Sequence, residues 1–234
     1  MSDVSFLQKG KGKDLLFLHG YLSSKEAFAA QVAYFSRFFR VTAIDFLGFG
    51  GSRCLTSAFS VSDYAIWLKT VLRALGVKKP HVIAHSFGCR VAVKAASSDP
   101  ELFDKIVLTG PAGVIVNRGT RYRFKVRLYR FVKRFAPKFA EKKFGSEEYR
   151  CLSPIMKESY KKIVNEDLRE SARLVENQVL IIEGNADGVT TMTEAEIYRE
   201  HFPRASLRII EGGHFAFAEN PVSFNLITEE FFYG

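Results

Sequence analysis

Cysteine is scarce in this sequence of 234 residues, and no hydrophobic run in it is long enough to cross a bilayer. The three cysteines, Cys54, Cys89 and Cys151, are odd in number and show no paired spacing. This pattern argues against a disulfide framework or a zinc site and favours a reducing compartment. The first residues, Met1–Phe6, lack the basic region and apolar stretch of a secretory signal. We therefore expect a cytoplasmic protein that binds no metal.

Motifs for nucleotides and nucleic acids are missing as well. The glycine-rich run Gly48–Gly51 has neither the G-x-G-x-x-G spacing of a dinucleotide-binding loop nor the lysine of a P-loop. The formal net charge is +9, but no nucleic-acid-binding motif accompanies the basic residues. We therefore expect no nucleotide cofactor and no nucleic-acid partner.

Apolar residues make up 47% of the chain, which is enough to fill the core of one sizeable domain. Short apolar runs alternate with amphipathic helices, a pattern typical of a mostly parallel sheet with helices on both faces. The expected strands are Val4–Leu7, Leu15–Leu18, Phe39–Ile44, Val82–Ala84, Asp104–Thr109, Val179–Gly184 and Leu207–Ile210. The alternation stops over residues 114–177. We therefore predict an α/β core formed by residues 1–113 and 178–234, with residues 114–177 inserted as a helical unit.

One serine lies between a predicted buried strand and a predicted helix. Ser86 follows the apolar run that ends at Ala84 and precedes the helical stretch from Val91 onward. Its neighbours two positions away, Ala84 and Gly88, are small, as a sharp turn with a strained serine backbone requires. Such a turn holds the hydroxyl above the carboxyl edge of the sheet, next to the positive end of a helix. Ser86 is therefore a candidate nucleophile.

An acid and a histidine follow two later strands. Asp187 comes just after Val179–Gly184, and His214 comes just after Leu207–Ile210. Catalytic groups collect at the carboxyl ends of parallel strands, so both should lie at the same sheet edge as Ser86. A serine hydroxyl needs a base, and the base needs a carboxylate that fixes its tautomer. Ser86, His214 and Asp187 fit these three roles.

These motifs together carry a family resemblance over nearly the whole chain. They are Leu18-His19-Gly20, Asp45–Ser52, Ala84–Gly88, Gly184–Asp187, and Gly212–Phe215 with Glu219–Pro221. In this order they resemble the α/β-hydrolase-fold serine hydrolases, especially the capped esterase-like and C–C hydrolase-like members. The sequence departs from the usual G-x-S-x-G pentad at Ala84. The resemblance implies the α/β-hydrolase fold, a helical cap formed by residues 114–177, and the triad Ser86, Asp187 and His214.

The resemblance also implies an oxyanion hole and a substrate pocket. One backbone N–H of the hole would come from Phe87 and the other from Tyr21, with Leu22 as the less favoured choice. The residues that we expect to line the pocket are His19, Leu22, Phe124, Leu128, Val189 and Phe215. His19 also has an alternative interpretation, in which it makes structural hydrogen bonds beside the turn.

Several other residues have structural interpretations. Asp45 precedes a glycine-rich turn and should hold that turn together. His85 should point away from the site, and Cys89 should be packed in the core. We expect His81 and His201, at the ends of elements, to be solvated.

The positive charge of the chain is concentrated in the insert. Between Val114 and Gln178 there are 17 basic and 8 acidic residues, which accounts for the whole net charge. Phe124, Leu128, Phe131 and Phe135 recur at helical spacing beside a row of arginines. We expect the aromatic stripe to face the pocket. The basic face is then a solvated surface, an attractor of anionic substrates or lipids, or, as the least favoured interpretation, a nucleic-acid site.

The leading functional prediction is a serine hydrolase that cleaves a carboxylic ester or a related small acyl substrate through an acyl-enzyme, without a cofactor. Two alternatives stay open. The same triad serves C–C bond hydrolysis of oxo-dienoate-type substrates, which a basic cap would suit. The chain could instead be a ligand-binding or signalling protein with low turnover. No sequence feature bears on its oligomeric state.

Overall fold

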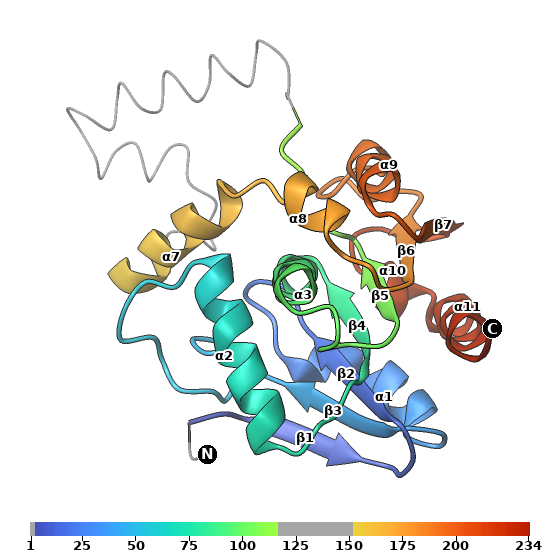
Figure 1. Ribbon diagram of the computed structural model, residues 1–234, viewed down its shortest axis with the longest axis horizontal. Coiled ribbons are helices and arrows are strands. Elements are labelled where there is room, and N and C mark those ends of the chain that lie inside the picture. The colour runs from blue at the N-terminus through green and yellow to red at the C-terminus, as the bar shows by residue number, and fades with distance from the viewer. Residues whose placement is uncertain (1–2, 117–151) are drawn as a thin grey trace.

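One mixed sheet forms the centre of the molecule (Figure 1). The computed structural model describes residues 3–116 and 152–234, and within them the strand order is β1-β3-β2-β4-β5-β6-β7. The strands are β1 (Phe6–Lys9), β2 (Asp14–Leu18), β3 (Arg40–Ile44), β4 (His81–His85), β5 (Ile106–Thr109), β6 (Val179–Gly184) and β7 (Ala205–Ile210). Strand β1 pairs antiparallel with β3, and all other pairs are parallel. The predicted α/β architecture is confirmed.

Helices cover both faces of this sheet (Figure 1). The described helices are the 3₁₀ turn η1 (Lys25–Phe28), α1 (Ala29–Phe35), α2 (Val61–Ala74), α3 (Phe87–Ser98), α7 (Pro154–Val164), α8 (Arg169–Arg173), α9 (Met192–His201), α10 (Ala216–Glu219) and α11 (Pro221–Tyr233). Helices α2, α3, α8 and α9 pack on one face, and η1, α1, α10 and α11 pack on the other.

The alternation of side chains along the strands explains why the sheet has two cores. In β2, Leu16 and Leu18 point into the core beneath α2 and α3, whereas Leu15 and Phe17 point into the core beneath α1 and α11. Successive residues of a strand point to opposite faces, so a strand covered on both faces is apolar over most of its length. Leu15–Leu18 are all buried, as their continuous apolar sequence predicted, and the buried Asp14 at the start of β2 pairs with Arg40.

The first strand is offset from its predicted position. The sequence predicted Val4–Leu7, but β1 runs from Phe6 to Lys9 and is exposed along its whole length. Ser5, just before β1, is hydrogen-bonded to the loop after β3: its N–H donates to Ser52 Oγ and its carbonyl accepts from the Asp45 N–H. Apolar residues are a poor guide to an exposed edge strand, whose register is set by backbone pairing.

The described end of the insert is attached to the helix that follows Ser86. Arg90 on α3 is buried, and its guanidinium donates to the carbonyls of Ile163, at the end of α7, and Glu166, at 2.9 and 2.7 Å. Helix α8 packs against α3 and α9 within the same core. The division of the chain into a core and a cap at residues 114–177 stays a prediction. The predicted stripe, with Phe124 and Leu128, lies outside the described residues.

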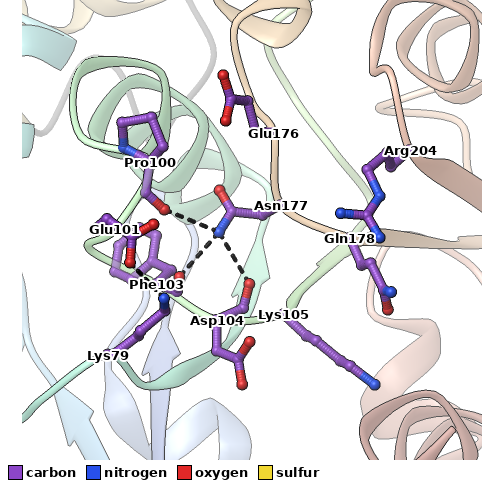
Figure 2. Close-up of a pocket in the computed structure, with 10 residues that line it drawn as sticks. All are labelled: Lys79, Pro100, Glu101, Phe103, Asp104, Lys105, Glu176, Asn177, Gln178 and Arg204. Carbon is purple, nitrogen blue, oxygen red and sulfur yellow. Dashed lines mark hydrogen bonds and ion pairs between the residues drawn. The ribbon is translucent and has the colours of Figure 1, made fainter.

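Where the chain returns from the insert to the sheet, it is held by the side chain of Asn177, which we call the Asn177 clamp (Figure 2). The amide nitrogen of Asn177 donates to three carbonyls, those of Pro100, Phe103 and Asp104, at 3.3, 2.9 and 3.0 Å. The clamp borders an open depression that is also lined by Lys105 and Arg204. These residues precede the starts of β5, β6 and β7, so the depression lies at the sheet edge opposite to the predicted catalytic residues.

Candidate active site

The turn at Ser86 has the strained backbone that its sequence context predicted. Ser86 lies between β4 and α3 with φ +49° and ψ −107°, a conformation that costs a non-glycine residue about 1–3 kcal/mol. Its N–H donates to Thr109 O at 3.1 Å, which ties the turn to β5. A Cβ at Gly88 would lie only 2.2 Å from Leu18 O, so the glycine allows α3 to cross closely over β2.

Asp187 and His214 form a direct hydrogen bond at the carboxyl ends of β6 and β7. The distance between Asp187 Oδ2 and His214 Nδ1 is 2.7 Å, and the two side chains are 1% and 14% exposed. Because the carboxylate accepts, Nδ1 carries the proton and Nε2 is left as the acceptor. Burial alone would raise the pKa of Asp187, but hydrogen bonds from His214 and the backbone outweigh burial and lower the pKa to about 2. Asp187 is therefore a stable carboxylate.

The two loops that carry this pair are joined to each other by backbone contacts. The N–H of Asn185 donates to Ile210 O, and the N–H of Ala186 donates to Gly212 O, both at 2.9 Å. Gly184 makes the approach sterically possible, since a Cβ there would lie 2.3 Å from the Gly213 carbonyl oxygen. The parallel pairing of β6 and β7 therefore continues into the loops and brings an acid and a base from distant parts of the chain together.

His85 connects the histidine loop to the serine turn. Its Nε2–H donates to His214 O at 2.9 Å, and the two rings lie 4.7 Å apart between centroids. Burial lowers the pKa of His85 to about 3, so the ring is neutral. His214 thus sits against the residue that precedes Ser86. Among the described residues, the Ser86 hydroxyl makes no hydrogen bond to His214.

The turn after β2 lies next to Ser86 and is supported by His19. A Cβ at Gly20 would be 3.5 Å from Ser86 Cβ. His19 Nε2 accepts from the Phe46 N–H at 3.1 Å, so Nδ1 is protonated and donates to Gly20 O at 2.7 Å. The carbonyl and N–H of a trans peptide point in opposite directions. The Tyr21 N–H therefore points away from His19. His19 is fully buried and supports this turn from behind instead of lining a pocket.

The turn after β2 and the loops after β6 and β7 each carry an exposed apolar side chain. Leu22, Val189 and Phe215 are 47%, 56% and 44% exposed, and their predicted place in the lining of a substrate pocket stays a prediction. Sequence reasoning missed the contact with α7: the Tyr21 hydroxyl donates to Met156 O at 3.2 Å. The rings of Tyr21 and Tyr160 lie 5.2 Å apart, so α7 covers the Tyr21 turn.

The structural interpretations of Asp45 and Cys89 are confirmed. Asp45 accepts from the N–H groups of Lys25 and Gly51, at 2.7 and 2.9 Å, and so holds the glycine-rich turn. Cys89 is completely buried. The prediction that His81 is solvated is wrong. His81 is buried and stacks on Phe232 at 4.4 Å, because α11 folds back over the start of β4.

Two residues beside the acid were also missed. Thr190 donates its hydroxyl to Asp187 Oδ2 at 2.9 Å, and its N–H donates to Asp187 Oδ1 at 3.0 Å. An aspartate that bonds backbone N–H groups two and three residues later is a common turn, so the spacing from Asp187 to Thr190 was a usable signal. Glu183 at the end of β6 is buried next to Asp187 and was read only as part of a strand.

No described helix is long and apolar enough to span a membrane. Residues 3–116 and 152–234 contain no group of three or more histidine, cysteine or acidic side chains arranged to hold a metal ion.

Comparison with known sequences gives one family and several distant relatives. The family model described as the alpha/beta hydrolase fold matches residues 14–178. An uncharacterised protein of Mycobacterium tuberculosis is 25% identical over 97% of this chain and 77% of its own length. A probable lysophospholipase of Arabidopsis thaliana is 32% identical, but the match covers 54% of this chain and only 26% of that protein.

Solved structures of hydrolases share the fold over almost the entire chain. A membrane phospholipase A described as a bacterial virulence factor superposes with a TM-score of 0.81, at 21% identity, over 99% of this chain and 82% of that one. An esterase from Exiguobacterium antarcticum gives 0.78 at 20% identity over 99% and 96%. A meta-cleavage product hydrolase from Pseudomonas fluorescens gives 0.76 at 21% identity over 98% and 94%. At these identities the likeness concerns the fold alone.

Proposed function

The chain belongs to the α/β-hydrolase fold family, and from that premise we propose that it is a serine hydrolase that cleaves a carboxylic ester or a related small acyl substrate. The observation that supports this most directly is the 2.7 Å hydrogen bond between Asp187 and His214, beside a serine held at φ +49°. An ionised acid, a histidine with Nε2 left as acceptor and a strained serine turn are the parts that acyl transfer requires.

The proposed reaction has two halves. Ser86 Oγ attacks the carbonyl carbon while His214 Nε2 takes the hydroxyl proton, and the Asp187 carboxylate stabilises the resulting imidazolium. The N–H groups of Phe87 and Tyr21 bind the oxyanion, each contributing about 3 kcal/mol of transition-state stabilisation. His214 then protonates the leaving oxygen, which departs as an alcohol. Water, deprotonated by His214, then attacks the acyl carbon, and His214 returns that proton to Ser86 Oγ as the bond between Oγ and the acyl group breaks and the carboxylic acid is released.

A small, partly apolar acyl group fits the surroundings of these residues. Leu22, Val189 and Phe215 offer exposed apolar surface beside the triad, and α7 covers the Tyr21 turn. The basic insert favours substrates that carry a negative charge. The mechanism calls for no cofactor.

C–C bond hydrolysis is the second candidate for the same site. It is favoured by the positive charge of the insert, which suits acidic substrates. A similar protein, the (E)-2-((N-methylformamido)methylene)succinate hydrolase of Acinetobacter baylyi, is named for an acidic substrate and is 26% identical over 45% of this chain and 40% of that protein. The third candidate function is ligand binding, with a triad that is nearly inert.

One labelling experiment separates an enzyme from a binding protein. A fluorophosphonate probe should label the wild-type protein and not Ser86→Ala, with the exposed Ser57→Ala as the matched control that keeps full labelling. Turnover of short p-nitrophenyl esters compared with a panel of oxo-dienoates then distinguishes the two chemistries. A folded wild-type protein that resists the probe and turns over neither class would refute the hydrolase proposal.

Contact with anionic lipid is proposed separately, on the charge of the insert alone. Eleven basic residues and one acid lie between Arg118 and Lys143, and basic amphipathic segments bind anionic membrane surfaces. Sedimentation with vesicles containing phosphatidylserine should show binding that weakens as salt rises. No binding at low salt would remove this proposal.

The cellular location is a further proposal. Because Cys54 and Cys89 are unpaired, we place the protein in the cytoplasm.

A further inference from the structure

A buried glutamate next to the triad acid has no donor for its carboxyl group. Glu183 is the fifth residue of β6 and is fully buried. No N–H or O–H group of the described residues donates to either of its carboxyl oxygens. Among the described residues, Glu183 also forms no ion pair with a basic side chain. An ionised carboxylate left in this state would pay a large desolvation cost without compensation.

The groups that face Glu183 are acidic or apolar in character. In addition to burial, Asp187, on the loop after β6, raises the pKa of Glu183 through its negative charge and through a hydrogen bond with it, and Glu194 on α9 adds a second negative charge. On α3, burial raises the pKa of the Cys89 thiol, and the charge of Glu183 raises it further, so this group is neutral as well. A neutral carboxylic acid has one O–H donor, and the acceptor within reach is the carboxylate of Asp187.

We propose that Glu183 is a positioning residue of the catalytic site: it keeps its proton and donates it in a hydrogen bond to Asp187, which orients that carboxylate toward His214. This inference rests on the proposed hydrolase function. Asp187 already accepts from Val189, Thr190 and His214. Glu183 adds a donor from the rigid sheet, whereas the Val189 and Thr190 donors belong to the same loop as Asp187 and move with it.

The arrangement gives the site a built-in sensitivity to high pH. Burial first, and then the adjacent Asp187, raise the pKa of Glu183 to about 9. Below that pH, Glu183 and Asp187 together carry one negative charge, and the carboxylate of Asp187 is hydrogen-bonded to His214. Above it, two like charges lie together in a buried place without a cation, and Asp187 is pushed away from its position. Activity should therefore fall as the pH rises through about 9.

The test compares two substitutions that differ only in the donor. Glu183→Gln keeps an N–H donor toward Asp187 and cannot ionise, so it should retain activity at pH 7 and lose the alkaline decline. Glu183→Leu has a similar volume and no donor. It should lower kcat by about tenfold with little change in KM, as expected for the loss of one hydrogen bond to a charged group. Glu196→Gln, the same change at an exposed position of α9, should match the wild type.

The readouts are kcat and KM between pH 6 and 10.5, with circular dichroism to confirm folding. The inference is overturned if Glu183→Gln keeps the alkaline decline, or if folded Glu183→Leu matches the wild type. Infrared spectroscopy gives a readout that does not need turnover. At pH 7 the wild type should show the carbonyl stretch of a protonated carboxyl that is absent in Glu183→Gln, and a lack of this band would equally overturn the inference. If the wild type neither reacts with the fluorophosphonate probe nor shows turnover but shows the band, the hydrolase proposal fails while the proton on Glu183 stands.

Discussion

At the scale of single residues, the two oxygens of Asp187 have different partners. Oδ1 accepts the N–H groups of Val189 and Thr190, at 2.7 and 3.0 Å, whereas Oδ2 faces His214. In Asp187→Asn the amide oxygen must stay on the backbone side, which turns the NH₂ group toward His214 Nδ1. The histidine then adopts the opposite tautomer and cannot accept the serine proton. We expect kcat to fall by roughly 10⁴-fold, as for the same change in another triad, with little change in melting temperature.

Thr190→Val is the informative comparison for that substitution. It removes a hydroxyl donor to Asp187 Oδ2 but leaves the carboxylate, and with it the histidine tautomer, in place. Steady-state rates should drop by about tenfold or less, the value of one hydrogen bond to a charged group. Equal losses in the two variants would contradict the tautomer argument.

Local spacing decided which residues could be predicted from the sequence. Ser86 was found because a nucleophile turn needs small residues at fixed distances, and Asp187 and His214 because each follows an apolar strand. Glu183 was not found, because a polar residue inside an apolar strand says nothing about which neighbours bury it. The burial of His81 depends on α11, which lies more than a hundred residues further along the chain. Contacts of that kind leave no local pattern.

At the scale of elements, the central strands could be predicted and the edges could not. Strands β2, β4 and β6 are buried along their full length, so each needs a continuous apolar run that is visible in the sequence. Strand β7 at the sheet edge begins at Ala205, two residues before the predicted start, because its partly exposed residues need not be apolar. The same freedom shifted the predicted position of β1.

The close crossing of α3 over β2 should depend on the glycine at position 88. A Cβ at Gly88 would meet only backbone atoms, Leu18 O at 2.2 Å and His19 O at 2.9 Å, which cannot move as a side chain would. Gly88→Ala must therefore push α3 away from β2, which also moves the N–H of Phe87 relative to the Tyr21 turn. We expect a loss of about 3 kcal/mol in unfolding free energy, measured by urea denaturation, together with reduced probe labelling.

Gly188→Ala is the matched control for that change. Gly188 is exposed beside the triad acid, has no neighbouring atom within 4 Å of an added Cβ, and lies outside the left-handed region. Its stability should stay within about 0.5 kcal/mol of the wild type. If Gly88→Ala were as stable as Gly188→Ala, the close crossing of α3 and β2 would not be a requirement of this fold.

At the scale of the whole molecule, buried histidines link stability to pH. Burial lowers the pKa of His19, His81 and His85, so the folded protein holds all three in the neutral form. The unfolded chain binds protons on these residues below about pH 6.5. Stability that depends on them is therefore complete above about pH 6.5 and is lost as the pH falls toward the folded-state values. Acid should weaken this protein before its carboxylates are protonated.

His81 allows this link to be tested away from the active site. Burial, followed by the nearby charge of Lys13, lowers its pKa to about 4, with Asp104 opposing and Lys105 adding to the shift. Its Nδ1 accepts from the Lys105 N–H at 3.2 Å, and the side-chain oxygen of an asparagine can take over that role. In the wild type, protonation of His81 should cost up to about 3 kcal/mol of unfolding free energy between pH 6.5 and 4. His81→Asn should start less stable at pH 7, because it loses the ring stacked on Phe232, and should lose less on acidification. Urea denaturation at several pH values measures both slopes, and equal slopes in the two proteins would show that the buried ring at this position does not titrate with folding.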